Sequence, residues 1–377
     1  MATLAQATQA TRSLLKWGGV AIVVFIILRY LIFPIGFAMY RNLFPKKPPV
    51  PTTTFGKLPR IPFPSGDKFT NTIYTINTTT GTLPPTCLYN TCTKPQDPTN
   101  PLAIPDRLTV HPITKQTAIF SSYASAKQKV SDVGFTGEGK ALTETMYLWQ
   151  HPKVPGRQIV FDIITQKFDL TSDMASIGAD LMGSPPSVDT SIDLATSFLS
   201  NINLLPKDID ETKTQTLFFK LTAPGDSANP PGANSLIPAT SLSDSSFIQV
   251  DFHRKPLEDL PILNPYPQPS LLSFLVRTAP EKKLAIVEGH FSYKPLDKTT
   301  SATYPIKTAQ QAFTELQEGK AYILPGSTKS SRIAIQKVYL AYYEGSDSVR
   351  YFLPIFVFEG ENSFVAYVEA IQDQWLE

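Results

Sequence analysis

The longest hydrophobic stretch of the chain covers residues 18–40 and contains Arg29 as its only charged residue. At about 1.5 Å per residue, a helix of this length spans roughly 34 Å, which is enough to cross the hydrocarbon core of a bilayer with some tilt. The stretch is longer than the apolar region of a cleaved signal peptide, and no small-residue cleavage site follows it. The pattern therefore predicts an uncleaved transmembrane anchor that contacts membrane lipid, with a kink at Pro34.

Arg29 lies near the centre of this predicted helix, where a charge is costly in lipid. Either its guanidinium extends toward the headgroups, or it meets a polar group on another membrane helix. The second alternative predicts a membrane-embedded protein partner.

Beyond residue 106 the hydrophobic pattern changes repeatedly between helical spacing and strand alternation. Three segments have helical spacing: 122–133, 188–204 and 308–318. Strands are expected after each of them, at residues 144–150, 158–169, 214–221, 247–254, 332–343, 351–358 and 364–371. Turns between neighbouring strands are too short for parallel crossovers, which indicates antiparallel pairing. The expected fold class is α+β, built from repeated units of a helix followed by an antiparallel hairpin.

The helix at 308–318 has the clearest amphipathic pattern. Ala309, Ala312, Phe313 and Leu316 follow the i, i+3, i+4, i+7 spacing of one helix face. We expect this face to pack on strand residues that include Ile335, Leu340 and Phe356.

Between the anchor and residue 106 the chain is rich in Pro and Thr, which favours extended backbone and lacks the apolar content for a separate core. Residues 41–105 therefore read as a stalk. One island, residues 69–77, alternates apolar and polar positions, and we expect it to form a strand that pairs with the following domain.

These patterns divide the chain into five parts: a short basic tail at 1–17, the transmembrane helix at 18–40, the stalk at 41–105, an α+β region at 106–300 and a final α+β unit at 301–377.

Charge is distributed unevenly along the chain. Residues 1–66 contain eight Lys and Arg residues and no Asp or Glu, so the remainder carries −6 because the whole chain carries +2. The basic block therefore lies beside the predicted anchor, where anionic headgroups attract it. The outer region has no basic patch, and we expect no nucleic-acid partner.

Cys87 and Cys92 are the only cysteines of the chain, and they lie in a Thr/Pro-rich loop. No nearby His or Cys completes a metal set, so a short-loop disulfide is the preferred interpretation, with two free or buried thiols as the alternative. A disulfide favours an extracytoplasmic location for the large domain, although counting the flanking positive charges would place it in the cytoplasm.

Motifs for catalysis or cofactor binding are weak. Residues 134–140 match the Gly-x4-Gly-Lys part of a nucleotide-binding loop, but Ala141 replaces the required Ser or Thr, and a glycine-rich connection is the simpler interpretation. The acidic run 208–211 lacks the spacing of a calcium loop. The four histidines are scattered and form no recognised metal or catalytic motif: His111, His151, His253 and His290. We expect no cofactor, no metal site and no catalytic residue from these motifs.

An aromatic cluster on the strands at 332–343 and 351–358 is the candidate interaction surface. The surface consists of the aromatic residues Tyr339, Tyr342, Tyr343 and Phe352, together with the neighbouring Pro354. Core packing is the alternative for most of them, because strands covered on both faces are nearly continuous in apolar residues. Pro354 cannot donate a backbone hydrogen bond, which predicts a bulge or an edge strand open to strand addition by a peptide.

The run at 304–323, with strands IAIQKVYLAYY (333–343) and YFLPIFVFEG (351–360), resembles the C-terminal part of PepSY-like and YycI-type domains. The resemblance covers residues 300–371. It implies a non-catalytic extracytoplasmic domain, often on one transmembrane helix, that binds or restrains a membrane histidine kinase or a peptidase.

The expected function is therefore protein or peptide binding by a single-pass membrane protein. Two alternatives from other classes are an envelope-anchored hydrolase whose site is assembled from distant residues, and a structural part of an envelope assembly. A pocket that brings His253 or His290 near a Ser or a carboxylate would favour the hydrolase.

Overall fold

The computed structural model describes residues 25, 51–67, 69, 71–88, 92, 99, 101–174, 185–222, 235–266, 270–327, 329–345 and 349–377. The chain divides into two compact units, residues 1–50 with 87–92, and residues 51–86 with 93–377. The predicted basic tail, the predicted anchor at 18–40 and Arg29 lie outside the described residues, apart from Phe25. Among the described residues, no helix has both the length and the apolar content needed to cross a membrane.

The larger unit has a mixed α+β fold with three α-helices among its described residues: α3 (Ser122–Asp132), α5 (Val188–Asn201) and α6 (Ala309–Gln317). Short 3-10 turns are η2 (Glu211–Lys213), η3 (Leu242–Asp244), η4 (Lys282–Leu284) and η5 (Asp373–Trp375). Two short strands, β2 (Thr86–Cys87) and β3 (Ile104–Pro105), lie outside the two large sheets. The helices match the three predicted segments to within a few residues.

Local chemistry explains where the helices begin and end. The Thr308 hydroxyl accepts from Gln311 N at 3.1 Å, and the Gln311 side chain accepts from Thr308 N at 2.8 Å, so a capping box starts α6. Ser187 caps α5 in the simpler way, by accepting from Thr190 N. Beyond α3, Gly134 adopts a φ of +104°, which only glycine reaches without strain, and the chain reverses there.

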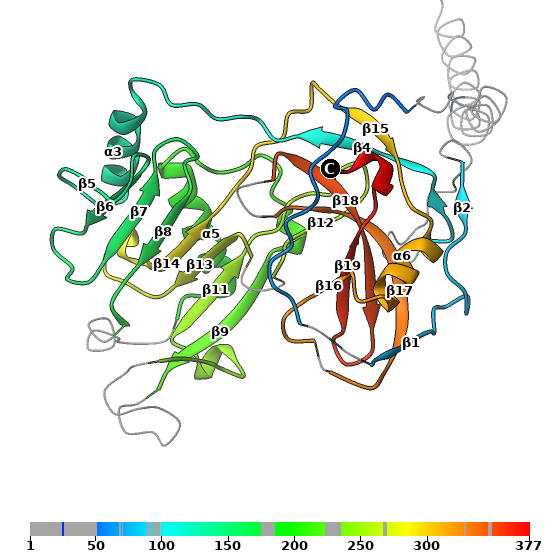
Figure 1. Cartoon of the computed structure of the whole chain (residues 1–377). Helices are drawn as coiled ribbons and strands as arrows, with labels where there is room; N and C mark the ends of the chain where they lie inside the picture. Colours follow the sequence, from blue (N-terminus) through cyan, green and yellow to red (C-terminus); the bar gives the residue numbers. More distant parts are fainter. Residues whose placement is uncertain are drawn as a thin grey trace, which may run out of the picture. The chain divides into compact units, whose positions relative to one another are not determined.

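One large sheet has nine strands in the order β10-β9-β11-β13-β14-β8-β7-β6-β5, all antiparallel (Figure 1). Its strands are β5 (Lys140–Ala141), β6 (Met146–Gln150), β7 (Gln158–Asp162), β8 (Phe168–Thr171), β9 (Gln215–Leu221), β10 (Leu236–Pro238), β11 (Phe247–Asp251), β13 (Leu272–Val276) and β14 (Ile286–Phe291). Helices α3 and α5 cover one face, where Val130 and Phe198 join Ile159, Phe168 and Phe274 in a buried core.

The other large sheet has eight strands and curves into a half-barrel (Figure 1). Its strands are β1 (Ile73–Ile76), β4 (Arg107–Pro112), β12 (Ile262–Leu263), β15 (Ala302–Pro305), β16 (Tyr322–Ile323), β17 (Arg332–Tyr343), β18 (Tyr351–Gly360) and β19 (Val365–Glu369). The order is β1-β17-β18-β19-β16, with β4 joining β18 to β15 and β12 joining β17. Pairing is antiparallel except that β1 and β12 both run parallel to β17.

Helix α6 packs on this second sheet as its pattern predicts. Ala309, Ala312, Phe313 and Leu316 are buried, and they share a core with Ile335, Leu340 and Phe356. The ring of Phe313 lies 6.1 Å from that of Phe358. The helix-on-sheet prediction for this region is confirmed.

The structure corrects two expectations about the strands and adds two strands that the pattern did not predict. Residues 158–169 form two strands, β7 and β8, because the Asp162 carboxylate accepts from Ile164 N and Thr165 N and turns the chain between them. Strands that follow α3 and α5 belong to one sheet, so the expected helix-and-hairpin units are not separate. Neither β13 nor β14 was expected from the pattern.

The region expected to be a stalk also differs from its prediction. Leu58 and Ile61 are buried in the core of the eight-stranded sheet, and the Phe63 ring stacks on Tyr322 at 5.3 Å. Strand β1 pairs with β17, as expected for the island at 69–77, although in parallel. Residues 51–76 therefore complete the domain rather than stand apart from it, because a few apolar side chains suffice to anchor an extended Pro-rich segment.

Candidate functional site

The aromatic candidate surface is buried. Tyr339, Tyr342, Tyr343 and Phe352 are each at most 5% exposed, and Pro354 is buried with them. Strand β18 lies between β17 and β19, so Pro354 is on a central strand and not on an edge. The proposed interaction surface and the strand-addition site at Pro354 were wrong, because both faces of these strands are covered, as a continuous apolar run indicates.

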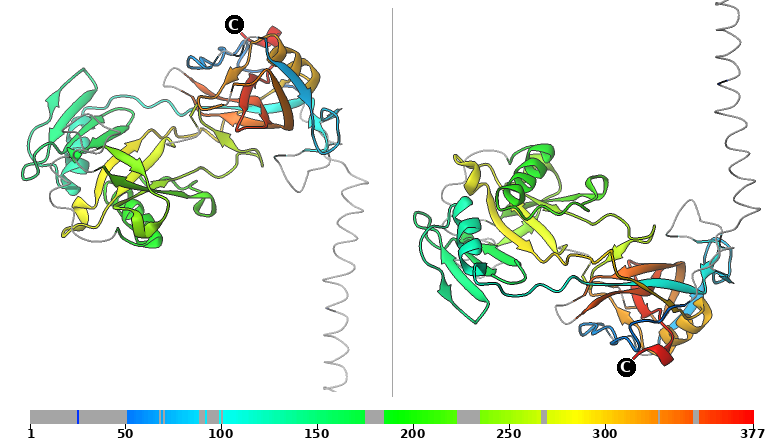
Figure 2. Two further views of the ribbon diagram at one scale, coloured as in Figure 1. Left: turned by 90° about the horizontal axis from the view of Figure 1, so that it is seen from below. Right: turned by 90° about the horizontal axis from the view of Figure 1, so that it is seen from above.

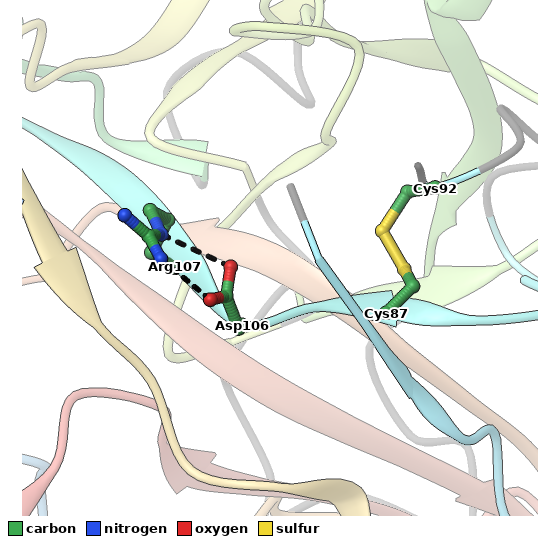
Figure 3. Close-up of a disulfide and its surroundings, with 4 residues drawn as sticks. All are labelled: Cys87, Cys92, Asp106 and Arg107. Atoms are coloured by element: carbon green, nitrogen blue, oxygen red, sulfur yellow. Dashed lines mark hydrogen bonds and ion pairs between the residues drawn. A yellow bond between two sulfur atoms is a disulfide. The ribbon is translucent and has the colours of Figure 1, made fainter. Parts of the chain in front are cut away.

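Cys87 and Cys92 form a disulfide, with their Cα atoms 5.4 Å apart (Figure 3). The backbone N–H of Cys92 donates to Leu88 O at 3.1 Å, which closes the short loop. Figure 3 also draws an ion pair of the larger unit, in which Arg107 meets the adjacent Asp106 at 2.7 Å.

The glycine-rich loop 134–140 connects helix α3 to strand β5. A nucleotide-binding loop has the opposite order, since it follows a strand and opens a helix. In the acidic run, Asp210 accepts from Thr212 N and caps η2, while the Asp208 carboxylate binds Arg254. The described residues contain no group of three or more His, Cys, Asp and Glu side chains arranged to hold a metal ion.

Two histidines have carboxylate partners that are distant in sequence. His111 Nε2 lies 3.0 Å from Glu258 Oε1 and is buried, whereas His290 Nδ1 lies 2.6 Å from Asp169 Oδ1 on an exposed sheet face. His290 and Asp169 are direct cross-strand neighbours on β14 and β8. The sequence did not indicate either pair, because strand register brings His290 to Asp169, and Glu258 reaches His111 from a turn that is distant in sequence.

His253 lines a small cavity with Ser292 and Glu344, the kind of grouping that a hydrolase would need. The cavity volume is about 20 Å³, which holds about one water molecule. No substrate fits beside these three side chains in this conformation.

Arg254 forms the centre of a buried charge cluster next to that cavity. Its guanidinium donates to Asp208 Oδ2 at 2.7 and 3.0 Å and to Glu344 Oε1 at 2.9 Å. The same group stacks on the rings of Tyr293 at 4.5 Å and Phe352 at 5.0 Å. Burial opposes the charge of Arg254, but Glu344 and Asp208 outweigh this effect and raise its pKa.

The Arg254 cluster links the two sheets of the larger unit. Asp208 follows α5, whereas Glu344 follows β17 of the eight-stranded sheet. Lys294 adds a further contact by donating its ammonium to Gly345 O, and burial lowers its pKa to about 8. With nearly all donors and acceptors satisfied internally, this cluster is a structural clamp.

An extended segment, residues 114–119, runs from β4 to α3 and is called the strap below (Figures 1 and 2). Its ends are fixed, since Thr114 N donates to Pro295 O at 2.8 Å and Ile119 N donates to Ser122 Oγ at 3.0 Å. Between these ends, residues 115–118 form no backbone hydrogen bond with any described part of the chain. Lys115, Thr117 and Ala118 are exposed.

Gln116 holds the middle of the strap against the β7–β8 turn. With Nε2 facing the two carbonyls, its amide donates to Ile164 O at 3.0 Å and to Thr165 O at 2.9 Å. The Asp162 carboxylate stabilises this turn by accepting from two of its amides, Ile164 N and Thr165 N, and Gln166 adopts a φ of +58°.

A cavity opens on each side of Gln116, each with a volume of about 190 Å³. The cavity beside α3, called the α3 cavity, has an apolar floor made by Ile119, Ala126, Phe161, Ile163 and Ile164. The cavity beside Leu205, called the Leu205 cavity, is lined by Leu204, Leu205, Pro206, Phe291, Asn203 and Thr165. Gln116 and Gln166 belong to both linings, so the two cavities are neighbours along the strap.

The strap and the two cavities beside it together form a groove, called the strap groove below. It has few polar or charged features. Lys129 lines the α3 cavity, but its ammonium donates to Ile202 O at 2.6 Å, and burial lowers its pKa. Thr165 Oγ1 is buried in the lining of the Leu205 cavity and has no hydrogen-bond partner among the described residues. Ile119 is 65% exposed and Phe120 is fully exposed at the rim. Such a groove suits a ligand that combines apolar side chains with a few backbone polar groups.

Sequence reasoning missed this groove. Its walls come from four separated segments, near residues 116, 126, 163 and 205. The available signal was the apolar pair Ile119–Phe120 placed directly before a predicted helix, where no predicted strand or helix would bury it.

Comparison with known proteins adds little to this geometry. No protein-family model matches the chain, and no curated protein matches it. Among solved structures, an uncharacterized protein from Eubacterium rectale matches over 71% of this chain and 84% of that chain, with 12% sequence identity and a TM-score of 0.38. A likeness of this degree leaves function to be argued from the chain's own residues.

Proposed function

We propose that this chain is a single-pass membrane protein whose extracytoplasmic α+β domain binds a protein or peptide segment. The anchor rests on the apolar run at 18–40, and the location of the domain rests on the bonded pair Cys87 and Cys92. The Lys and Arg residues that flank the anchor, Arg12, Lys16, Arg41, Lys46 and Lys47, would then contact anionic lipid headgroups.

The observation that carries the binding function is the strap groove. An extended segment, whose backbone groups at 115–118 have no partner among the described residues, lines two partly apolar cavities. Exposed backbone edges and exposed apolar rims are features of protein-binding surfaces. The cavity beside His253 is too small for a substrate, which makes binding a better-supported function than hydrolysis.

The PepSY-like assignment of residues 301–377 belongs to the same proposal. Helix α6 on strands β17, β18 and β19 is compatible with it. If the assignment holds, the protein partner is a membrane histidine kinase or a peptidase, and Arg29 would contact that partner within the bilayer.

The first test is selection of binders from a random peptide library by the full-length protein in lipid nanodiscs. We expect peptides enriched over empty nanodiscs. Absence of enrichment over the empty nanodiscs would overturn the binding function.

A topology measurement tests the location independently. Protease added to intact cells stripped of any outer wall should release a fragment that begins near residue 51, where the described domain starts. Full protection of the domain would place it in the cytoplasm.

A further inference from the structure

We infer that the strap binds an extended peptide by strand addition, and that two apolar side chains of this peptide, separated by one residue, enter the α3 cavity and the Leu205 cavity. This inference rests on the proposed binding function and specifies its ligand class.

The backbone of the strap is the first line of support. Lys115, Gln116, Thr117 and Ala118 each present an amide and a carbonyl that no described residue pairs. Extended backbone of this kind pairs with a second extended chain, because the N–H and C=O groups of alternate residues, which face that chain, then gain partners along the edge. A peptide strand therefore fits the site better than a compact ligand, which would leave most of these groups unpaired.

The spacing of the cavities is the second line of support. Both cavities contain Gln116 and Gln166 in their linings, so these two side chains form the wall between them. Side chains at i and i+2 of a strand point to the same face and lie about 7 Å apart. A ligand with apolar residues at these two positions places one on each side of the wall.

The cavity linings define the kind of side chain. Phe161, Ile163 and Ala126 floor the α3 cavity, and Leu204, Leu205 and Phe291 line the Leu205 cavity. Each volume of about 190 Å³ accommodates an aliphatic or aromatic side chain.

The test uses the full-length protein in nanodiscs and a panel of seven-residue fluorescent peptides. The lead peptide carries Leu-Thr-Leu between polar flanks, and its isomers move the second Leu to the adjacent position or one position farther. We expect the Leu-x-Leu peptide to bind at least about tenfold more tightly than either isomer, since each isomer removes one buried side chain. Equal affinities would overturn the inference.

Backbone pairing is tested with N-methylated versions of the lead peptide. Methylation at alternate residues should abolish binding in one register and leave it nearly unchanged in the other, because only every second amide of a strand faces its neighbour. Uniform tolerance of N-methylation would contradict strand addition.

Two exposed positions test the cavities without disturbing the core. Ile119→Asp charges the rim of the α3 cavity, and Leu205→Asp charges the wall of the Leu205 cavity, where Leu205 is 39% exposed. Each should weaken the lead peptide at least about tenfold. The control is Leu142→Asp, which is 49% exposed and lines neither cavity, and it should leave affinity unchanged.

These results separate the inference from the proposed function. If library peptides bind but resist Ile119→Asp and Leu205→Asp, binding occurs elsewhere and only the inference falls. If no library peptide binds, both fall. A photo-crosslinker placed at Thr117 should react with the peptide, and reaction with a second copy of the chain instead would overturn the inference by showing that the strap pairs with itself.

Discussion

The two sheets of the larger unit bury their strands differently. In the eight-stranded sheet, β17 and β18 are covered on both faces, so that Tyr342, Ile355, Phe356 and Val357 all have essentially no exposed surface. The nine-stranded sheet is covered by α3 and α5 on one face, while its other face exposes Asp169 and His290. The first sheet is thus the buried framework of the domain, and the candidate binding groove lies at the margin of the more open one.

The same difference explains why the Tyr-rich strands β17 and β18 do not form a binding surface. Tyr residues are frequent in binding surfaces, yet the Tyr342 hydroxyl donates to Thr109 O at 2.8 Å inside the core. The open region offers instead a polar strap that has little aromatic character. Function in this molecule is therefore expected where the backbone lacks partners rather than where aromatic residues are dense.

The largest expected effect comes from the clamp between the sheets. Arg254→Met leaves the buried Glu344 carboxylate and the partly buried Asp208 carboxylate without their cation and should cost about 3–5 kcal/mol of unfolding free energy. Chemical denaturation followed by fluorescence measures it. Arg60→Met is the matched control, because the Arg60 side chain is 52% exposed and its pair with Glu369 should contribute less than about 1 kcal/mol. Equal costs for the two variants would show that Arg254 is not a clamp.

A slightly smaller effect is expected within the framework sheet. Phe313→Ala empties a core site under α6 and should cost about 3 kcal/mol, the lower end of the range for aromatic truncation, because Phe313 is 6% exposed. Gln310→Ala, on the exposed face of the same helix, should cost almost nothing. Gln311 is unsuitable as the control because its side chain completes the capping box. Thermal melts of both variants measure the difference, and an unchanged melting temperature for Phe313→Ala would remove α6 from the core.

The smallest effect concerns pH. The pKa of Lys294 is lowered from 10.5 to about 8 in the folded protein, so the unfolded chain binds more protons between these values. Stability should therefore rise with pH from about 8 to 10, by an amount on the order of 1 kcal/mol. Lys129 and Lys167 are shifted in the same direction, and Tyr293, whose pKa burial raises to about 12, acts oppositely only above pH 10.

Lys294→Met should flatten that rise without abolishing it, because the other two lysines remain. Denaturation series at pH 7, 8, 9 and 10 measure the slope of the unfolding free energy against pH for both proteins. This range covers the expected rise from about pH 8 to 10. An unchanged slope in Lys294→Met would mean that Lys294 keeps its ordinary pKa.

Sequence patterns predicted the elements whose signals are local. Helix α6 was recognisable from its four-residue apolar stripe and from Gly319 beyond its end, and β17 from a continuous run of apolar and aromatic residues. The division of 158–169 into two strands was missed, because it depends on the Asp162 carboxylate binding two amides of a short turn. Periodicity does not record a side-chain hydrogen bond of this kind.

Features that depend on packing between distant segments could not be predicted from local sequence patterns. Leu58 and Ile61 belong to the core of a sheet made mostly of residues beyond 300, and no local pattern distinguishes them from a stalk. The groove likewise needs Gln116 of the strap to meet Ile164 and Thr165 of the β7–β8 turn, which are distant from it in sequence. Contacts of this kind depend on how distant segments pack in the folded chain, and local sequence patterns do not show this.

Hydrogen exchange at the strap tests the central claim most directly. In the free full-length protein the amides of residues 115–118 should exchange at rates typical of unpaired backbone, while those of β17 and β18 should exchange far more slowly. Saturation with the Leu-x-Leu peptide should slow exchange at the strap selectively. Strap amides that are already protected in the free protein, or the absence of added protection at every strap amide when the peptide is bound, would contradict the account.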